Sequence, residues 1–143
     1  MAAAVHACGL LYSSVPLRSR SKLEKTAFAA LESVATRHFD STLSAVAALR
    51  AEGVAVWCME TTEGALNYAA ATTEFPARGV ALVLGNEETG VDTRVIEAAD
   101  AVVEIPTFGT HLGSHNASTA AMIGMYEYCR QRDAATRPRS TSA

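Results

Sequence analysis

Hydrophobic residues along the chain gather in short solid runs, separated by longer stretches in which they recur at helical spacing. The solid runs cover residues 7–12, 54–59, 80–84 and 101–105. Runs of this length without alternating polar residues predict strands that are buried on both faces of a sheet. Helical spacing of apolar residues predicts helices at 22–37, 43–51 and, as the longest, 116–132.

Residues around these segments mark where the helices begin. Ser41 and its neighbours supply N-cap side chains for the helix at 43–51, and Asp92 is placed to cap a short helix that runs through Ala99. Residues 61–77 are ambiguous and leave room for a short helix at 65–71. Because strands alternate with helices, the pattern predicts an α/β fold with a mostly parallel sheet flanked by helices.

Three loops follow the predicted strands, at the sheet edge where open α/β folds bind ligands. They cover residues 60–64, 85–90 and 106–114, and the middle one reads GNEETG. This loop lacks the lysine of a Walker loop and does not match GxGxxG. Its two adjacent carboxylates, Glu87 and Glu88, oppose phosphate binding. The loop therefore suits a neutral, cationic or hydroxyl-rich ligand, or is a plain strand-to-helix turn.

Composition and charge limit the domain organisation and the kinds of ligand that the sequence predicts. The 143 residues predict one domain over 1–132 and a polar, disordered tail over 133–143. The net charge of −3 gives no overall signal for nucleic acid, and the basic stretches near both ends either bind phosphate groups or are solvated surface. Three distant cysteines favour reduced thiols and an intracellular location. We expect no membrane span, and His111 and His115 lack a third metal ligand.

Two ordered motifs in the second half resemble a known family. ALVLGNEETGVD (81–92) and EIPTFGTHLGSHNASTA (104–120) are similar to the second and third motifs of the SpoU-type (TrmH-like) RNA 2′-O-ribose methyltransferases of the SPOUT superfamily. Residues 21–42 resemble the family's middle region more weakly, and the likeness covers nearly all of 5–132.

This resemblance implies a SPOUT fold with a C-terminal trefoil knot and S-adenosyl-L-methionine as cofactor. It also implies an RNA substrate, tRNA or rRNA, and a homodimer formed through the knot region and the last helix. No metal is implied. Carried onto this chain, the cofactor-binding positions are Glu60, Gly85, Ile105, Thr107 and Ser114, and the catalytic positions are Glu87, Ser114 and Asn116.

The chain also departs from the family pattern. The first motif, with an arginine that helps activate the target hydroxyl, has no counterpart here, because the sequence starts just after that region. We therefore expect a domain that is N-terminally truncated relative to the family, and the alternative function is a non-catalytic RNA-binding or dimerisation module. His115 stands where leucine is usual, as a ligand contact or as an altered packing residue, and Ala117 replaces the usual valine.

Overall fold

A four-stranded parallel sheet forms the centre of the computed structural model, which describes residues 11–12, 37–70, 76, 78–86, 88–108 and 115–136. Its order is β4-β6-β3-β5, and each neighbouring pair is parallel. A separate two-stranded parallel sheet joins β1 (Leu11–Tyr12) to β2 (Arg37–His38). The strands of the main sheet are β3 (Ala55–Met59), β4 (Leu66–Asn67), β5 (Val80–Leu84) and β6 (Ala101–Glu104).

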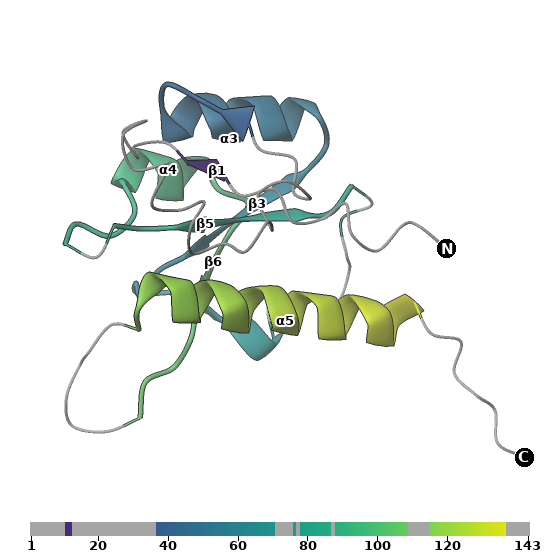
Figure 1. Ribbon diagram of the computed structural model, residues 1–143. Coiled ribbons are helices and arrows are strands. Elements are labelled where there is room, and N and C mark those ends of the chain that lie inside the picture. The colour runs from purple at the N-terminus through teal and green to yellow at the C-terminus, as the bar shows by residue number, and fades with distance from the viewer. Residues whose placement is uncertain are drawn as a thin grey trace, which may run out of the picture.

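Helices cover both faces of this sheet, as Figure 1 shows. The helices α3 (Thr42–Ala51) and α4 (Thr93–Ala98) lie on one face, and the long helix α5 (Ala117–Thr136) lies on the other. The predicted α/β architecture is therefore confirmed. Within the described ranges, none of the helices combines the length and the apolar character that crossing a bilayer requires.

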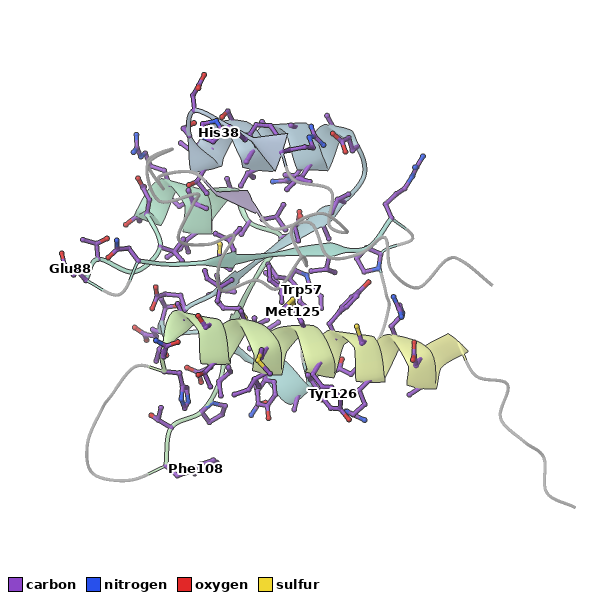
Figure 2. All side chains as sticks on the ribbon, in the orientation of Figure 1. His38, Trp57, Glu88, Phe108, Met125 and Tyr126 are labelled. Atoms are coloured by element: carbon purple, nitrogen blue, oxygen red, sulfur yellow. The ribbon has the colours of Figure 1, made fainter. Side chains whose placement is uncertain are left out.

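The central strand β3 divides the core into two layers, because successive side chains point to opposite faces. Val56 and Cys58 are fully buried in a cluster with residues of α3 and α4. Trp57 and Met59 pack with Tyr128 in a second cluster against α5. Figure 2 shows Trp57 between the sheet and α5. This burial on both faces explains why the strand reads as a solid apolar run.

Helix starts follow the capping residues seen in the sequence. Ser41 Oγ accepts a hydrogen bond from the Ser44 backbone N–H, and Ser44 Oγ caps the Ser41 N–H in return. Asp92 Oδ1 accepts from the Arg94 N–H at 2.9 Å at the start of α4. Both caps satisfy backbone donors that a first helical turn leaves without partners.

The ambiguous stretch, which left room for a short helix at 65–71, forms a short strand followed by a single 3₁₀ turn within its described residues. Residues 66 and 67 form β4, in register with Val103 and Glu104 of β6, and the chain then makes a 3₁₀ turn at Tyr68–Ala70. Pairing with β6 overrides the local preference of an alanine-rich stretch.

Two predicted boundaries also move. Arg37 was expected to end a helix but lies in strand β2, and residues 22–36 lie outside the described part of the chain. The tail was expected from residue 133, yet α5 continues to Thr136, since Ala134 and Ala135 favour a helix. The knot depends on the path of residues 109–114, which the structure does not describe, and it stays a prediction.

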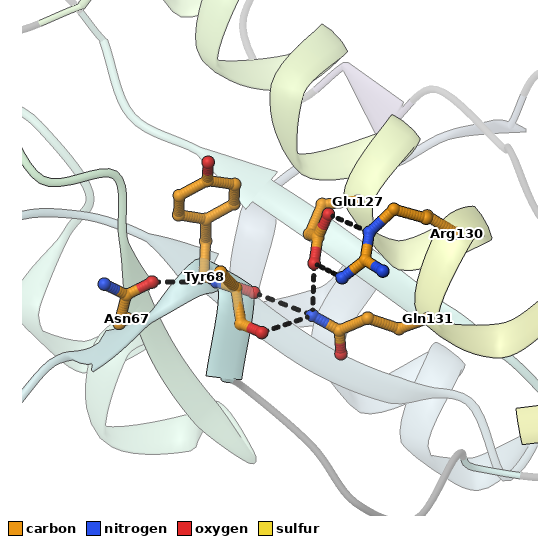
Figure 3. Close-up of polar contacts among 6 residues, drawn as sticks. Asn67, Tyr68, Glu127, Arg130 and Gln131 are labelled. Carbon is orange, nitrogen blue, oxygen red and sulfur yellow. Dashed lines mark hydrogen bonds and ion pairs between the residues drawn. The ribbon is translucent and has the colours of Figure 1, made fainter. Parts of the chain in front are cut away.

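A network of polar side chains ties the 3₁₀ turn to α5 (Figure 3). Glu127 is 9% exposed and accepts two hydrogen bonds from the Arg130 guanidinium, at 2.7 and 2.6 Å. Gln131 Nε2 donates to Glu127 Oε1 at 2.7 Å and to the carbonyl oxygens of Tyr68 and Ala69. The network therefore fixes the edge of the sheet against the C-terminal half of α5.

The stability that the Glu127 carboxylate contributes is expected to vary with pH only at low pH. Hydrogen bonds from Arg130 and then Gln131 lower the pKa of Glu127 from its ordinary value of 4.5 to about 2. A depressed folded-state pKa contributes stability that is present above 4.5 and is lost as the pH falls towards 2. In urea unfolding across this range, the gap in free energy between wild type and Glu127→Gln should shrink with falling pH. A gap that stays constant with pH would contradict this role of the carboxylate.

Candidate functional site

A cavity of about 200 Å³ lies where β3, β5 and β6 end, beside the first turn of α5. Four apolar side chains from the α5 side of the sheet line it, namely Met59, Leu84, Val103 and Ile105. Polar lining comes from the loops that follow the strands and from a residue two positions before α5, namely Glu60, Thr61, Asn86, Thr107 and His115. The cavity thus combines an apolar surface with hydrogen-bonding groups, as sites for small organic ligands do.

Four of the five predicted cofactor-binding positions meet at this cavity. Glu60 follows β3, Gly85 follows β5, and Ile105 and Thr107 follow β6, so three loops bring them together. The fifth, Ser114, lies outside the described residues. The roles of these residues stay predictions, although their convergence agrees with the expected ligand edge of the sheet.

The predicted catalytic positions are less completely described. Glu87 and Ser114 both lie outside the described residues. Asn116 Oδ1 accepts hydrogen bonds from the backbone N–H groups of Ser118, at 2.9 Å, and Thr119, at 3.4 Å. Asn116 therefore caps α5 directly beside the cavity, and its catalytic role stays a prediction.

The loop after β5 is closed by its own backbone. The N–H of Gly90 donates to the carbonyl of Asn86 at 2.8 Å, and the N–H of Asn86 donates to the carbonyl of Gly90 at 3.1 Å. A Cβ atom on Gly85 would lie 2.3 Å from the carbonyl carbon of Gly90. The loop can fold back on the strand end only because residue 85 has no side chain.

Glu60 joins this loop to the end of β3. Its Oε2 accepts a hydrogen bond from the Val91 N–H at 2.9 Å, and its Oε1 accepts from the Thr61 N–H at 3.1 Å. Gly90 has φ +67, and a Cβ atom there would lie 2.5 Å from Glu60 Oε2. The carboxylate therefore fits closely against a glycine and holds two cavity walls in register.

Replacement of Glu60 by alanine is expected to loosen the cavity without unfolding the sheet. Two backbone N–H groups lose their acceptor: the exposed Thr61 N–H can bond to water instead, whereas loss at the part-buried Val91 N–H costs about 1–3 kcal/mol in stability. Urea unfolding and ligand-binding calorimetry would measure the loss of stability and affinity. Glu60→Gln keeps one oxygen acceptor and should lose less of both. Equal losses in the two variants would contradict the hydrogen-bonding role.

Cys58 lies close to this site but is chemically unreactive. Burial, followed by the neighbouring charge of Glu60, raises the pKa of the Cys58 thiol to about 11. The thiol therefore stays protonated near neutral pH, which disfavours the thiolate form that nucleophiles and metal ligands need. No group of three or more metal-binding side chains occurs among the described residues.

Some residues of the cavity cannot be assigned from the sequence alone. For His115 the sequence allows either a ligand contact or a packing role, and the structure places it at the cavity wall as an exposed side chain. Asn86 and Gly90 were seen only as parts of the GNEETG loop, with no individual role. The backbone bridge between them could not be read from residue spacing, because it depends on how tightly the turn closes.

Solved structures of RNA methyltransferases have a similar fold. AviRb, a SpoU methyltransferase from Streptomyces viridochromogenes in complex with the cofactor AdoMet, has a TM-score of 0.71 and 25% identity over 88% of this chain and 50% of its own. The A. aeolicus TrmH/SpoU tRNA modifying enzyme has a TM-score of 0.66 and 25% identity over 83% of this chain and 60% of its own.

A third structure supports the fold alone. The AdoMet-bound rRNA methyltransferase from Sinorhizobium meliloti has a TM-score of 0.71 and 23% identity over 87% of this chain and 46% of its own. This chain thus spans about half the length of the structures that it resembles. Among curated protein sequences, no significant match was found.

The family assignment comes from the sequence as a whole. Residues 1–126 match the SpoU rRNA Methylase family. This range includes both motif-bearing loops and the first half of α5. The parallel sheet and the structural neighbours agree with this match. The chain belongs to the SpoU rRNA methylase family.

Proposed function

We propose that this chain binds S-adenosyl-L-methionine in the cavity and acts as an RNA 2′-O-ribose methyltransferase domain. The observation that carries the proposal is the convergence of Glu60, Gly85, Ile105 and Thr107 on one cavity, in a member of the SpoU family. AviRb, at 25% identity, was solved with this cofactor bound. The proposal includes the kind of substrate, which is tRNA or rRNA, and the atom that is methylated, which is the ribose 2′-oxygen.

The residues present fit this cofactor better than a nucleotide phosphate. No lysine or arginine lies among the described lining residues, whereas phosphate sites depend on such cations or on a free helix terminus. The apolar patch formed by Leu84, Val103 and Ile105 suits an adenine ring, and the folded loop after β5 offers backbone groups for hydrogen bonds. When bound, S-adenosylmethionine supplies a methyl group on a cationic sulfur. The acidic residues around the cavity are compatible with that charge.

A homodimer through α5 and the knot region forms part of the proposal. Met122 is 69% exposed and Tyr126 is 73% exposed, and they lie one helical turn apart on α5. Two large apolar side chains on the same exposed helix face are typical of an interface. Light scattering would measure the mass, and a monomer at micromolar concentration would contradict the dimer.

Two measurements test the function. Calorimetry with S-adenosylhomocysteine tests the cofactor site, and an absence of binding at millimolar ligand would refute it. Incorporation of labelled methyl groups into bulk unmodified tRNA and rRNA, followed by nucleoside analysis, tests the transfer and the 2′-oxygen. Cofactor or RNA binding without transfer would instead support the alternative, a non-catalytic RNA-binding or dimerisation module.

A further inference from the structure

Transfer to a hydroxyl needs a group that accepts the hydroxyl proton, and few lining side chains can do so. Among the described lining residues, only Glu60, Glu104 and His115 carry a carboxylate or an imidazole. Both oxygens of Glu60 already accept backbone hydrogen bonds. Glu60 therefore uses both oxygens to hold the cavity walls in place.

Glu104 is oriented away from the apolar patch of the cavity. Val103 and Ile105, its neighbours along β6, pack in the cluster that faces α5, and Val102 packs in the opposite cluster. Because side chains alternate along a strand, the Glu104 side chain points to the face opposite to α5. Glu104 therefore contributes to the cavity wall through its backbone atoms.

His115 remains, and its position suits a large substrate. The residue is exposed at the cavity wall, so an RNA ribose that approaches from solvent can reach it. No hydrogen bond or ion pair joins its side chain to the other described residues. The adjacent Asn116 caps α5 and thereby fixes the backbone on which the imidazole is mounted.

We propose that His115 is the general base of the reaction, an inference that rests on the proposed function. His115 takes the proton from the ribose hydroxyl while the oxygen–methyl bond forms and the methyl–sulfur bond breaks. The bonding pair returns to sulfur, which becomes a neutral thioether. The imidazolium then releases its proton to water, so the step needs no further reactant.

The first experiment compares two histidines in the same chain. His115→Gln should lower the single-turnover rate of methyl transfer to tRNA or rRNA by about 100-fold or more, as the loss of a positioned base does. His38→Gln is the matched control, because His38 is exposed in β2 on the opposite side of the sheet from α5 (Figure 2). It should transfer at the wild-type rate.

Two further measurements separate proton transfer from a structural role. Added imidazole should restore part of the transfer rate of His115→Ala, which leaves space at the cavity wall, but not that of His115→Leu. S-adenosylhomocysteine affinity, measured by calorimetry, should stay within about threefold of wild type in all three variants, which corresponds to less than 1 kcal/mol. Diethyl pyrocarbonate should modify His115 in the free protein, and RNA with S-adenosylhomocysteine should protect His115 but not His38.

The outcomes distinguish this inference from the proposed function. A methyl-transfer rate of His115→Gln within about threefold of the wild-type rate overturns the base role but not the proposed function. The side chain would then lower the activation free energy by less than 1 kcal/mol. Loss of transfer in Glu87→Gln with normal transfer in His115→Gln assigns the base to Glu87 and also overturns it. If wild type binds no S-adenosylhomocysteine and transfers no methyl group, the proposed function fails and the base role fails with it.

Discussion

Replacement of Gly85 by alanine is expected to remove most of the S-adenosylmethionine affinity while the sheet still folds. The new Cβ would lie 2.3 Å from the carbonyl carbon of Gly90 and 2.6 Å from the backbone nitrogen of Val91. Both are backbone atoms, so no side chain can turn aside, and the loop must open. The Asn86–Gly90 bridge and the Glu60–Val91 hydrogen bond then break together.

Overpacking of this kind costs about 1–3 kcal/mol, so the affinity should fall about 5- to 150-fold if the whole cost appears in binding. Calorimetry with S-adenosylhomocysteine measures the loss. Gly64→Ala is the control, because Gly64 has φ +82 and nothing lies within 4 Å of a Cβ there. It introduces left-handed backbone strain, which Gly85→Ala does not, but no clash, so a larger loss of affinity in Gly85→Ala is due to the clash. Wild-type affinity in Gly85→Ala would show that the closed loop does not shape the site.

The fold could be predicted where local residues determine it. β5 matches its predicted limits because the apolar run at 80–84 lies between Gly79 and Gly85. α3 and α4 begin after Ser41 and Asp92, whose side chains satisfy the first backbone donors. β4 could not be found in this way, because its two residues become a strand only by pairing with a segment more than 30 residues later in the chain.

In the candidate site, too, features set by local residues could be predicted and features set by distant contacts could not. Position after a buried strand, together with the family resemblance, was enough to place Glu60 and Gly85 at the ligand edge. The use of Glu60 as an acceptor for the Val91 N–H was not predictable, since the two residues approach only when β3 and β5 pair. The exposure of His115 at the cavity depends in turn on how α5 is seated on the sheet.

Trp57→Ala is expected to cause the largest loss of stability of any change discussed, about 3–5 kcal/mol in the free energy of unfolding. Trp57 is 8% exposed, and its ring meets that of Tyr128 edge to face, with centroids 6.2 Å apart and planes at 86°. The pair joins the central strand β3 to α5. Loss of the indole leaves a void that neither the sheet nor a straight helix can fill.

The cost extends to the site, because Ala117 and Ala120 of α5 form part of the cavity wall. Urea unfolding at one fixed protein concentration is the measurement, since a dimer's stability varies with concentration. Phe108→Ala is the matched aromatic control: Phe108 is 95% exposed, so its removal should change stability by less than about 0.5 kcal/mol. If the two variants lost similar stability, Trp57 would not anchor α5. Trp57→Phe should fall between them, because a smaller ring can still contact Tyr128 but leaves part of the void.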